Sequence, residues 1–412
     1  MTTIYQYIKR MENNDFTTLP LNEVDVLILN ELVYFPLDEY INSDLNHQSG
    51  IKLKDLYFLL ENTLKEMKKE NWVLVSEARI RLLKAISQAK RYQEVIIFGF
   101  VNQIKVEEEL QFAAMCLGLP TNELLVSYRG TDDTLTGWKE DCNLIYNRLV
   151  PAQRLAKYYL TSVYQAFQGV SLTISGHSKG GNLAIYAAAF QDEETQNSIR
   201  NVYSFDSPGF HLETIETVSY QNIQPKISHF VPEDSIVGMT LFHSQAPIVV
   251  KSRKKGFSQH IATNWLIADK QLERLDDRSD FSYLIDAVVK EWTIDRNDEE
   301  LKKIFNSCFD LLYETGAESL IEITSNPIKF SRLFLERLNL LESADREFLE
   351  HNLTNLGDVI KSHFIEQKRD RYHMMAFQFN DWLSNFQLSE HLTFESTLLN
   401  KFKERFIQKK EA

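Results

Sequence analysis

The spacing of apolar positions changes along the chain and predicts two kinds of element. From Leu21 to Phe35, apolar residues recur every three or four positions, which predicts a helix, and a second helix is expected from about Lys52 to Glu70. Shorter apolar runs rich in β-branched and aromatic residues follow, and these are typical of buried strands. The runs are Val95–Val101, Leu124–Tyr128, Val170–Ile174, Val202–Phe205, Ile227–Val231 and Pro247–Val250.

Helix-length segments lie between several of these runs, notably Pro151–Phe167 and Gly180–Phe190. Because strand and helix alternate, the pattern favours an α/β fold with a mostly parallel sheet covered on both faces. After about Asp269 the strand-like runs stop, and polar segments with helical spacing take over. We therefore expect a helical segment over residues 1–90, an α/β core over 91–269 and a helical region over 270–412.

Composition and charge narrow the class of protein. The chain has 412 residues, 43% hydrophobic and 25% charged, which is the composition of a folded globular protein. Its formal net charge of −13 repels phosphate backbones, so nucleic acid is not an expected partner. The 3 cysteines are widely spaced, and no signal-peptide stretch or membrane-spanning apolar run is present. We therefore expect a cytoplasmic chain without an integral membrane segment.

A G-x-S-x-G motif centred on Ser178 is the most informative stretch. A predicted strand leads into it and a predicted helix leads out, which is the context that a nucleophile elbow requires. The tight turn lifts the serine hydroxyl above the sheet edge and places it at the N-terminus of a helix, where backbone N–H groups favour negative charge. The alternative is a glycine-rich turn of no chemical meaning. A phosphate-binding loop is excluded because Lys179 stands between the serine and the glycines.

A nucleophilic serine needs an imidazole to take its proton and a carboxylate to orient that imidazole. Asp234 follows the predicted strand Ile227–Val231 and is the expected acid; Glu233 is the nearest substitute and Asp206 a weaker one. His260 lies in a predicted loop after the last strand and is the expected base. The chain order of serine, acid and histidine is the one found with this elbow.

The oxyanion formed in acyl transfer needs hydrogen-bond donors aimed at it. The backbone N–H of Lys179 is one expected donor, and the loop that follows Leu124–Tyr128 is expected to supply a second. A lysine next to the serine also predicts a polar mouth to the site.

Several of these stretches together resemble the class 3 lipases of the α/β-hydrolase superfamily. They are Y-R-G-T and G-W-x-x-D over residues 128–141, G-H-S-K-G-G-N-L-A over 176–184 and F-D-S-P-G-F over 205–210. This resemblance covers about 95–265. A closer one, which includes V-P-E-D-S-I-V-G-M over 231–239, is to a bacterial Mbeg-like family and extends from about 21 to beyond 321. The lipase resemblance implies that Thr131 contributes its backbone N–H, and its hydroxyl, to the oxyanion hole.

The sequence thus predicts an α/β-hydrolase fold and a serine hydrolase that cleaves a carboxylic ester or thioester through an acyl-enzyme. An amidase or an acyltransferase would use the same residues, and a non-catalytic binding protein that uses the helical region is the alternative of another class. The helical additions are expected to form a cap over the acyl pocket or a surface for self-association. No H-E-x-x-H metal motif is present, and this route of hydrolysis requires no cofactor.

Overall fold

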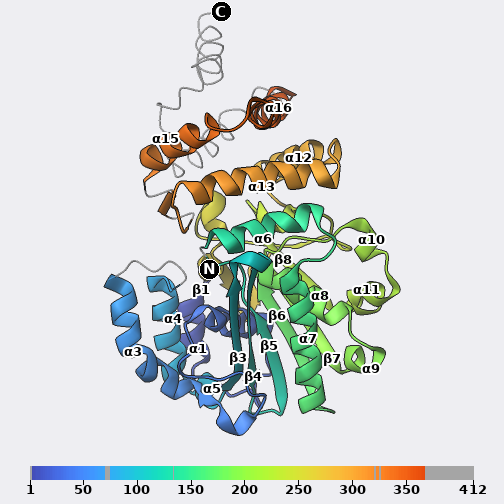
Figure 1. The fold of residues 1–412 in the computed structure, drawn as a ribbon. Coiled ribbons are helices and arrows are strands. Elements are labelled where there is room, and N and C mark those ends of the chain that lie inside the picture. Colours follow the sequence, from blue (N-terminus) through green and yellow to red (C-terminus); the bar gives the residue numbers. More distant parts are fainter. Residues whose placement is uncertain (1, 70–74, 133, 320–321, 324–325, 367–412) are drawn as a thin grey trace, which may run out of the picture.

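The computed structural model is built around an eight-stranded mixed sheet with helices on both faces (Figure 1). It describes residues 2–69, 75–132, 134–319, 322–323 and 326–366. The part of the expected helical region that follows residue 366 therefore lies outside the described residues. The strands of this sheet, in spatial order, are β2 (Ile51–Lys52), β3 (Ile96–Lys105), β4 (Leu110–Gly118), β5 (Glu123–Tyr128), β6 (Ser171–His177), β7 (Ile199–Phe205), β8 (Ile227–Pro232) and β9 (Ile248–Val250).

The strands β5 to β9 are parallel, and β2 to β5 pair antiparallel. This confirms the predicted α/β class, with all six predicted strands present. The sequence prediction missed β4, which lies in the middle of one half of the sheet and is buried along its whole length. Alanine, methionine and cysteine replace the usual β-branched residues there, so the run carries no strand signal of its own.

Successive residues of the strands enter two separate cores because their side chains point to opposite faces. In β4, Met115 and Leu117 pack with the N-terminal helices, whereas Ala114 and Cys116 pack with the helices of the other face. That second face is covered by α7 (Pro151–Ala166) and α8 (Lys179–Ala189), with the short helices α9 (Glu193–Ser198), α10 (Leu212–Ile215) and α11 (Val218–Ile223) beside them (Figure 1).

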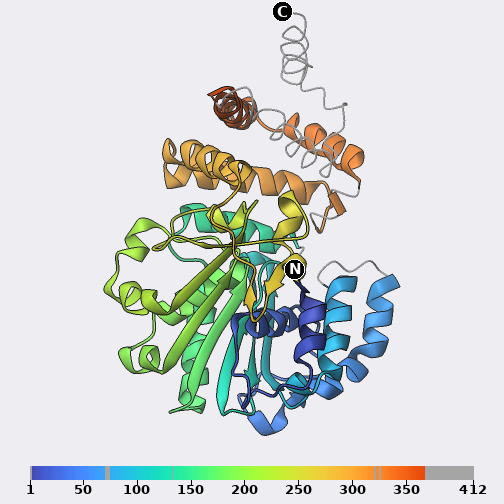
Figure 2. The same cartoon turned by 180° about the vertical axis from the view of Figure 1, so that it is seen from behind.

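The N-terminal segment covers the first face of the sheet (Figure 2). Its helix α2 contacts β5, β6 and β7, and Asn22 caps the helix by accepting hydrogen bonds from two backbone N–H groups of the first turn. A second sheet joins this segment to the end of the α/β core. The helices are α1 (Ile4–Met11), α2 (Glu23–Asn30), α3 (Leu53–Lys69), α4 (Glu77–Gln88) and α5 (Lys90–Gln93), and the small sheet is β1 (Thr2–Thr3), β10 (Leu266–Ala268) and β11 (Gln271–Leu272).

In the described part of the chain, further helices form a layer beyond the carboxyl ends of the parallel strands (Figure 1). They are α12 (Asp280–Ile294), α13 (Asp298–Glu314), α15 (Pro327–Leu338) and α16 (Ser343–Glu366). The layer rests on α6 (Leu135–Tyr146), since α13 and α6 share an apolar cluster that includes Leu135 and Phe309. None of the helices in the described part of the chain is long and apolar enough to span a bilayer.

Candidate active site

Ser178 lies in a strained turn between β6 and α8. Its backbone has φ 57° and ψ −135°, a conformation that non-glycine residues rarely adopt, and its N–H donates to the carbonyl of Phe205 at 2.9 Å. The strand before it and the helix after it are the context that the G-x-S-x-G motif requires. The side chain of Ser178 therefore stands at the carboxyl end of the sheet, on the first residue before the helix.

The glycines around Ser178 allow three backbones to meet at this turn. A Cβ on Gly176 would lie 1.9 Å from the carbonyl oxygen of Gly180, and one on Gly180 would lie 2.3 Å from that of Tyr128. A Cβ on Gly130 would lie 2.5 Å from the carbonyl oxygen of His177 and 2.9 Å from the Cβ of Ser178. Glycine leaves these spaces free, whereas any other side chain would clash with the neighbouring backbone. The loop after β5 can therefore lie directly against the turn at Ser178.

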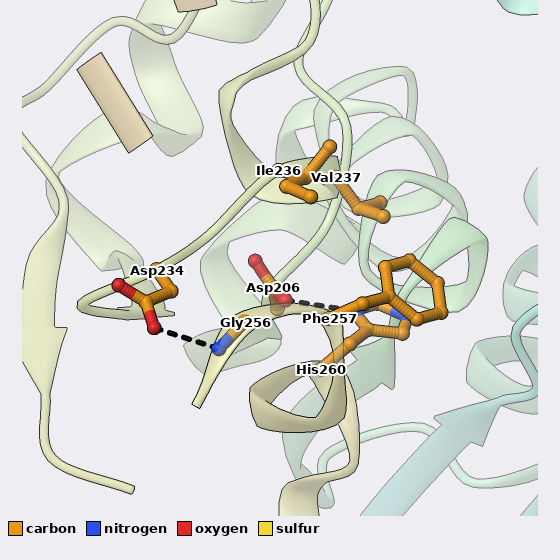
Figure 3. Close-up of a pocket in the computed structure, with 7 residues that line it drawn as sticks. All are labelled: Asp206, Asp234, Ile236, Val237, Gly256, Phe257 and His260. Carbon is orange, nitrogen blue, oxygen red and sulfur yellow. Dashed lines mark hydrogen bonds and ion pairs between the residues drawn. The ribbon is translucent and has the colours of Figure 1, made fainter. Parts of the chain in front are cut away.

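His260 comes to the same place from a distant part of the chain. It ends the 3₁₀ turn Gly256–His260, and its ring lies 4.6 Å from the ring of His177, the residue before the serine. The Nδ1 atom of His260 lies 2.6 Å from Oδ2 of Asp206, a buried carboxylate at the end of β7 (Figure 3). This bond fixes the ring and leaves Nε2 as the nitrogen that can exchange a proton.

Asp206 is held as an anion by its neighbours. Burial raises the pKa of its carboxyl, but the hydrogen bonds from His260 and from the Ser235 hydroxyl outweigh burial, so the net pKa lies below its ordinary value. The Oδ1 atom accepts from Ser235 Oγ at 2.5 Å and from the N–H of Gly238 at 3.1 Å. With Oδ2 occupied by His260, both oxygens are used.

The expected partner of His260, Asp234, does not contact the imidazole, and this part of the sequence prediction needs correction. Its Oδ2 accepts from the N–H of Gly256 at 2.7 Å (Figure 3). The same oxygen accepts from Nε2 of Gln259 at 2.9 Å. Gly256 opens the 3₁₀ turn that His260 ends, so Asp234 holds the turn and Asp206 holds the ring. Glu233 is the nearest substitute for Asp234 as the acid. Its Oε1 accepts a hydrogen bond from Nε2 of Gln259 at 3.3 Å, so this carboxylate also contacts the turn.

The sequence favours Asp206 less than Asp234, because the following Ser207, Pro208 and Gly209 explain it as a turn residue. The signal in its favour lies in the strand order, since β7 is the immediate neighbour of β6 and the ends of parallel neighbours meet at one edge. Sequence alone gives the succession of strands and not their pairing. A strained backbone at Asp206, with φ 46°, turns this side chain into the site.

The side chain of Lys179 is fully buried, so it does not lie at the mouth of the site, where the sequence prediction placed it. Its Nζ donates to Oε2 of Glu140 at 2.8 Å and to the carbonyl of Gln111 at 3.0 Å. Glu140 also accepts from the N–H groups of Gln111 and Ala152. The backbone N–H of Lys179 begins α8, where the first N–H groups of a helix have no intrahelical acceptor.

Thr131 lies in the loop that abuts the elbow, next to Gly130. Its hydroxyl donates to Oδ2 of Asp141. Burial raises the pKa of Asp141 to about 6, although the charge of Lys179 opposes this. The loop thus presents a threonine whose side chain is oriented by the half-buried carboxyl group of Asp141.

Apolar side chains surround the accessible side of His260. Ile236, Val237 and Phe257 line a hollow with His260, Asp206 and Asp234 (Figure 3). Phe257 stacks on His260 with ring centroids 5.8 Å apart, and Phe257 and Ile261 are 40% and 47% exposed. An apolar substrate group would find contact surface here. Within the described residues, no group of three or more histidine, cysteine or acidic side chains is placed to hold a metal ion.

Comparisons with known proteins give a family and a distant likeness in structure. The sequence profile described as Mbeg1-like matches residues 86–310, whereas no curated protein matches the chain. The M37 lipase is 13% identical with a TM-score of 0.33, over 54% of this chain and 75% of that one. The native Rhizomucor miehei lipase propeptide complex is 14% identical with a TM-score of 0.30, over 54% of this chain and 78% of that one. A deletion mutant of that lipase is 13% identical with a TM-score of 0.31, over 53% of this chain and 77% of that one.

Proposed function

Because the chain belongs to the Mbeg1-like family, whose matched region contains the strained serine turn and the imidazole–carboxylate pair beside it, we propose that it is a serine hydrolase. The substrate is a carboxylic ester or a thioester, cleaved through an acyl-enzyme. The observation that carries the proposal is the bond from His260 to Asp206, with the imidazole of His260 4.6 Å from the ring of His177, the residue that precedes Ser178.

In the proposed reaction, His260 Nε2 takes the proton of Ser178 as its oxygen attacks the acyl carbon. The carbonyl oxygen gains negative charge, which the backbone N–H groups of Lys179 and Thr131 stabilise. His260 then gives the proton to the leaving alcohol or thiol as the bond from the acyl carbon to that group breaks. Water then attacks the acyl carbon while His260 takes its proton. The bond from the acyl carbon to Ser178 breaks, His260 returns the proton to the serine oxygen, and the carboxylic acid is released. Asp206 stays ionised throughout and stabilises the imidazolium that forms.

The surroundings of His260 support an ester with an apolar group. Phe257, Ile261 and Ile236 offer apolar contact near the imidazole, and the one lysine beside the nucleophile is turned away into the core. Among the described residues that line this hollow, the acidic side chains are Asp206 and Asp234. Both already accept hydrogen bonds from the protein, Asp206 from His260, and Asp234 from Gly256 and Gln259.

The experiment that tests the proposal is labelling with a fluorophosphonate probe followed by peptide mapping. We expect the label on Ser178, and no label on Ser178→Ala or His260→Ala, because removing one member of such a unit costs almost all of its activity. A folded wild-type chain that stays unlabelled and cleaves no p-nitrophenyl ester would contradict the hydrolase assignment and favour a binding role for the fold.

Two matched amide variants separate the roles of the aspartates. Asp206→Asn should slow labelling by about 10³-fold or more, because the amide no longer stabilises the imidazolium or selects its tautomer. Asp234→Asn should slow it by no more than about 10-fold, because it only weakens the hydrogen bonds that hold the Gly256–His260 turn. The reverse order of the two effects would return the role of the acid to Asp234.

A further inference from the structure

We propose that Tyr34, which comes from the N-terminal segment, is a positioning residue. Through His177 it holds two parts of the site in register: the loop of Gly130 and Thr131 after β5, named the oxyanion loop for its proposed role, and the catalytic histidine, His260. The inference rests on the proposed function of Ser178 and His260, and it concerns residues to which the hydrolase mechanism assigns no part. Tyr34 also lies outside the region 86–310 that the family profile matches.

A single line of hydrogen bonds joins four parts of the chain at this point. The N–H of Gly130, in the loop after β5, donates to the Tyr34 hydroxyl at 3.2 Å. The hydroxyl lies 2.9 Å from Nδ1 of His177 and, less favourably, 3.5 Å from its carbonyl oxygen. Nε2 of His177 lies 2.7 Å from the carbonyl oxygen of His260. The line therefore runs from the oxyanion loop to the backbone of the catalytic histidine.

Chemistry fixes the direction of every bond in this line. The carbonyl of His260 only accepts, so Nε2 of His177 carries a proton and donates it. In a neutral imidazole Nδ1 then accepts, so the Tyr34 hydroxyl donates to it and its oxygen is left to accept from Gly130. Burial and, to a smaller extent, the charge of His260 lower the pKa of His177 to about 3, so the ring is neutral near pH 7.

Tyr34 is itself held in place. It is buried at the end of the 3₁₀ turn Glu31–Tyr34, and the guanidinium of Arg79, from α4, stacks over its ring at 3.7 Å. Arg79 in turn donates to Glu31 at 2.8 Å, which links α4 to the start of the same turn. The hydroxyl of Tyr34 therefore has little freedom to leave the position between Gly130 and His177.

The consequence is a fixed distance between the two groups that act on the substrate. The amide of Thr131 follows Gly130 directly, so the bond from Gly130 to Tyr34 fixes its position. His177 binds the backbone carbonyl of His260 and so fixes the residue that carries the catalytic imidazole. A shift of about 1 Å in such a constellation lowers the rate by about 10²-fold, even when the shift arises away from the chemistry. The N-terminal segment thereby aligns the site without touching the substrate.

The test compares Tyr34→Phe with Tyr7→Phe by fluorophosphonate labelling. Tyr7 is a matched control because it is also buried in the N-terminal segment, where its hydroxyl accepts from Asn22 and donates to Asp25, away from the site. We expect Tyr34→Phe to lower the maximal rate of labelling by about 10-fold or more, with the half-saturating probe concentration unchanged. Tyr7→Phe should lower the melting temperature and leave both constants unchanged. Equal labelling constants for Tyr34→Phe and wild type would overturn the inference.

A second pair of variants tests the His177 link. Glutamine retains an N–H near the position of Nε2, whereas alanine retains none, so His177→Gln should keep more of the maximal labelling rate than His177→Ala. Loss to the same extent in both variants would contradict a role that depends on the bond to the carbonyl of His260.

A spectroscopic measurement keeps this inference separable from the hydrolase proposal. In ¹⁵N spectra of the histidine-labelled chain, the resonances of His177 are assigned as those missing from His177→Gln. They should show a neutral ring with the proton on Nε2, and Tyr34→Phe should shift the Nδ1 resonance. An imidazolium, or a ring with its proton on Nδ1, would overturn the inference even if Ser178 reacts. An unlabelled wild-type chain with the expected resonances would contradict the hydrolase assignment while the hydrogen-bonded line stands.

Discussion

Ser178 and Asp206 are both non-glycine residues with positive φ, and they end neighbouring strands of the sheet. Such conformations are costly by about 1–3 kcal/mol each and persist only where the surrounding structure fixes them. Here the bond from the Ser178 N–H to Phe205 and the bond from the Asp206 N–H to Phe230 hold both turns. Strain at two adjacent strand ends places the serine and the carboxylate beside one another.

Lys179 has a proposed role in the site through its backbone N–H, and its buried side chain forms an ion pair with Glu140. We predict that Lys179→Met lowers the free energy of unfolding by about 3–5 kcal/mol, because it leaves Glu140 as a buried charge without its cation. The variant keeps the backbone N–H at the start of α8. Urea denaturation followed by fluorescence measures the loss.

The control for this prediction is Lys302→Met, which removes an exposed lysine of α13. It should change the free energy of unfolding by less than about 0.5 kcal/mol. A loss for Lys179→Met that is no larger than that of the control would mean that Glu140 takes up a proton, or a new partner, without cost.

At the scale of elements, the sequence predicted most of the sheet because its strands are short apolar runs rich in β-branched and aromatic residues, separated by helix-length segments. The helices Pro151–Ala166 and Lys179–Ala189 and the helix ending at Lys69 also agree with their predicted ranges. The predicted helix from Leu21 to Phe35 is shorter, since α2 ends at Asn30 and tightens into the 3₁₀ turn Glu31–Tyr34. That turn brings Tyr34 to the site, and apolar spacing carries no sign of it.

The site was predicted in part for a related reason. The turn from strand to helix is a local motif, so the strained conformation at Ser178 could be predicted from five consecutive residues. The partner of His260 depends on which strand ends lie side by side, and on backbone strain at Asp206. The roles of Glu140, Asp141 and His177 depend on contacts between elements far apart in the chain. No spacing in the sequence encodes those contacts.

The helical layer beyond the strand ends is attached to α6, the helix that follows the oxyanion loop. We predict that Leu135→Ala, at the start of α6, lowers stability by about 2–5 kcal/mol, because it leaves a cavity among Phe309, Ala317 and Phe330. The loss should make α12 and α13 more accessible, and limited proteolysis with mass mapping measures this.

The matched control is Leu340→Ala, since Leu340 is 74% exposed. It should leave both the unfolding midpoint and the proteolysis pattern unchanged. Faster cleavage confined to the N-terminal helices in Leu135→Ala would contradict the attachment of the helical layer to α6.

At the scale of the whole molecule, several buried histidines make stability depend on pH. Burial lowers the pKa of His177 to about 3 and that of His229 to about 4, and the pKa of His243 also lies well below its ordinary value. An unfolded histidine titrates near 6.5, so below that pH the unfolded chain binds more protons than the folded one. Stability is therefore full above about pH 6.5 and is lost as the pH falls toward these lowered values. Asp141 has the opposite effect on stability, because its pKa is raised to about 6. The folded chain therefore takes up this proton more readily than the unfolded chain, which adds stability as the pH falls.

The contribution of one ring can be isolated with His243→Phe. The ring of His243 stacks on that of His229 with centroids 4.0 Å apart, and its Nε2 is buried without a hydrogen-bond partner among the described residues, so phenylalanine preserves the packing and removes the titration. Wild type should lose stability between pH 7 and pH 5, and the variant should lose about 1–2 kcal/mol less. Urea denaturation at both pH values measures the difference. An identical loss in the two chains would mean that His243 keeps an ordinary pKa, which would require water or an acceptor at Nε2 in solution.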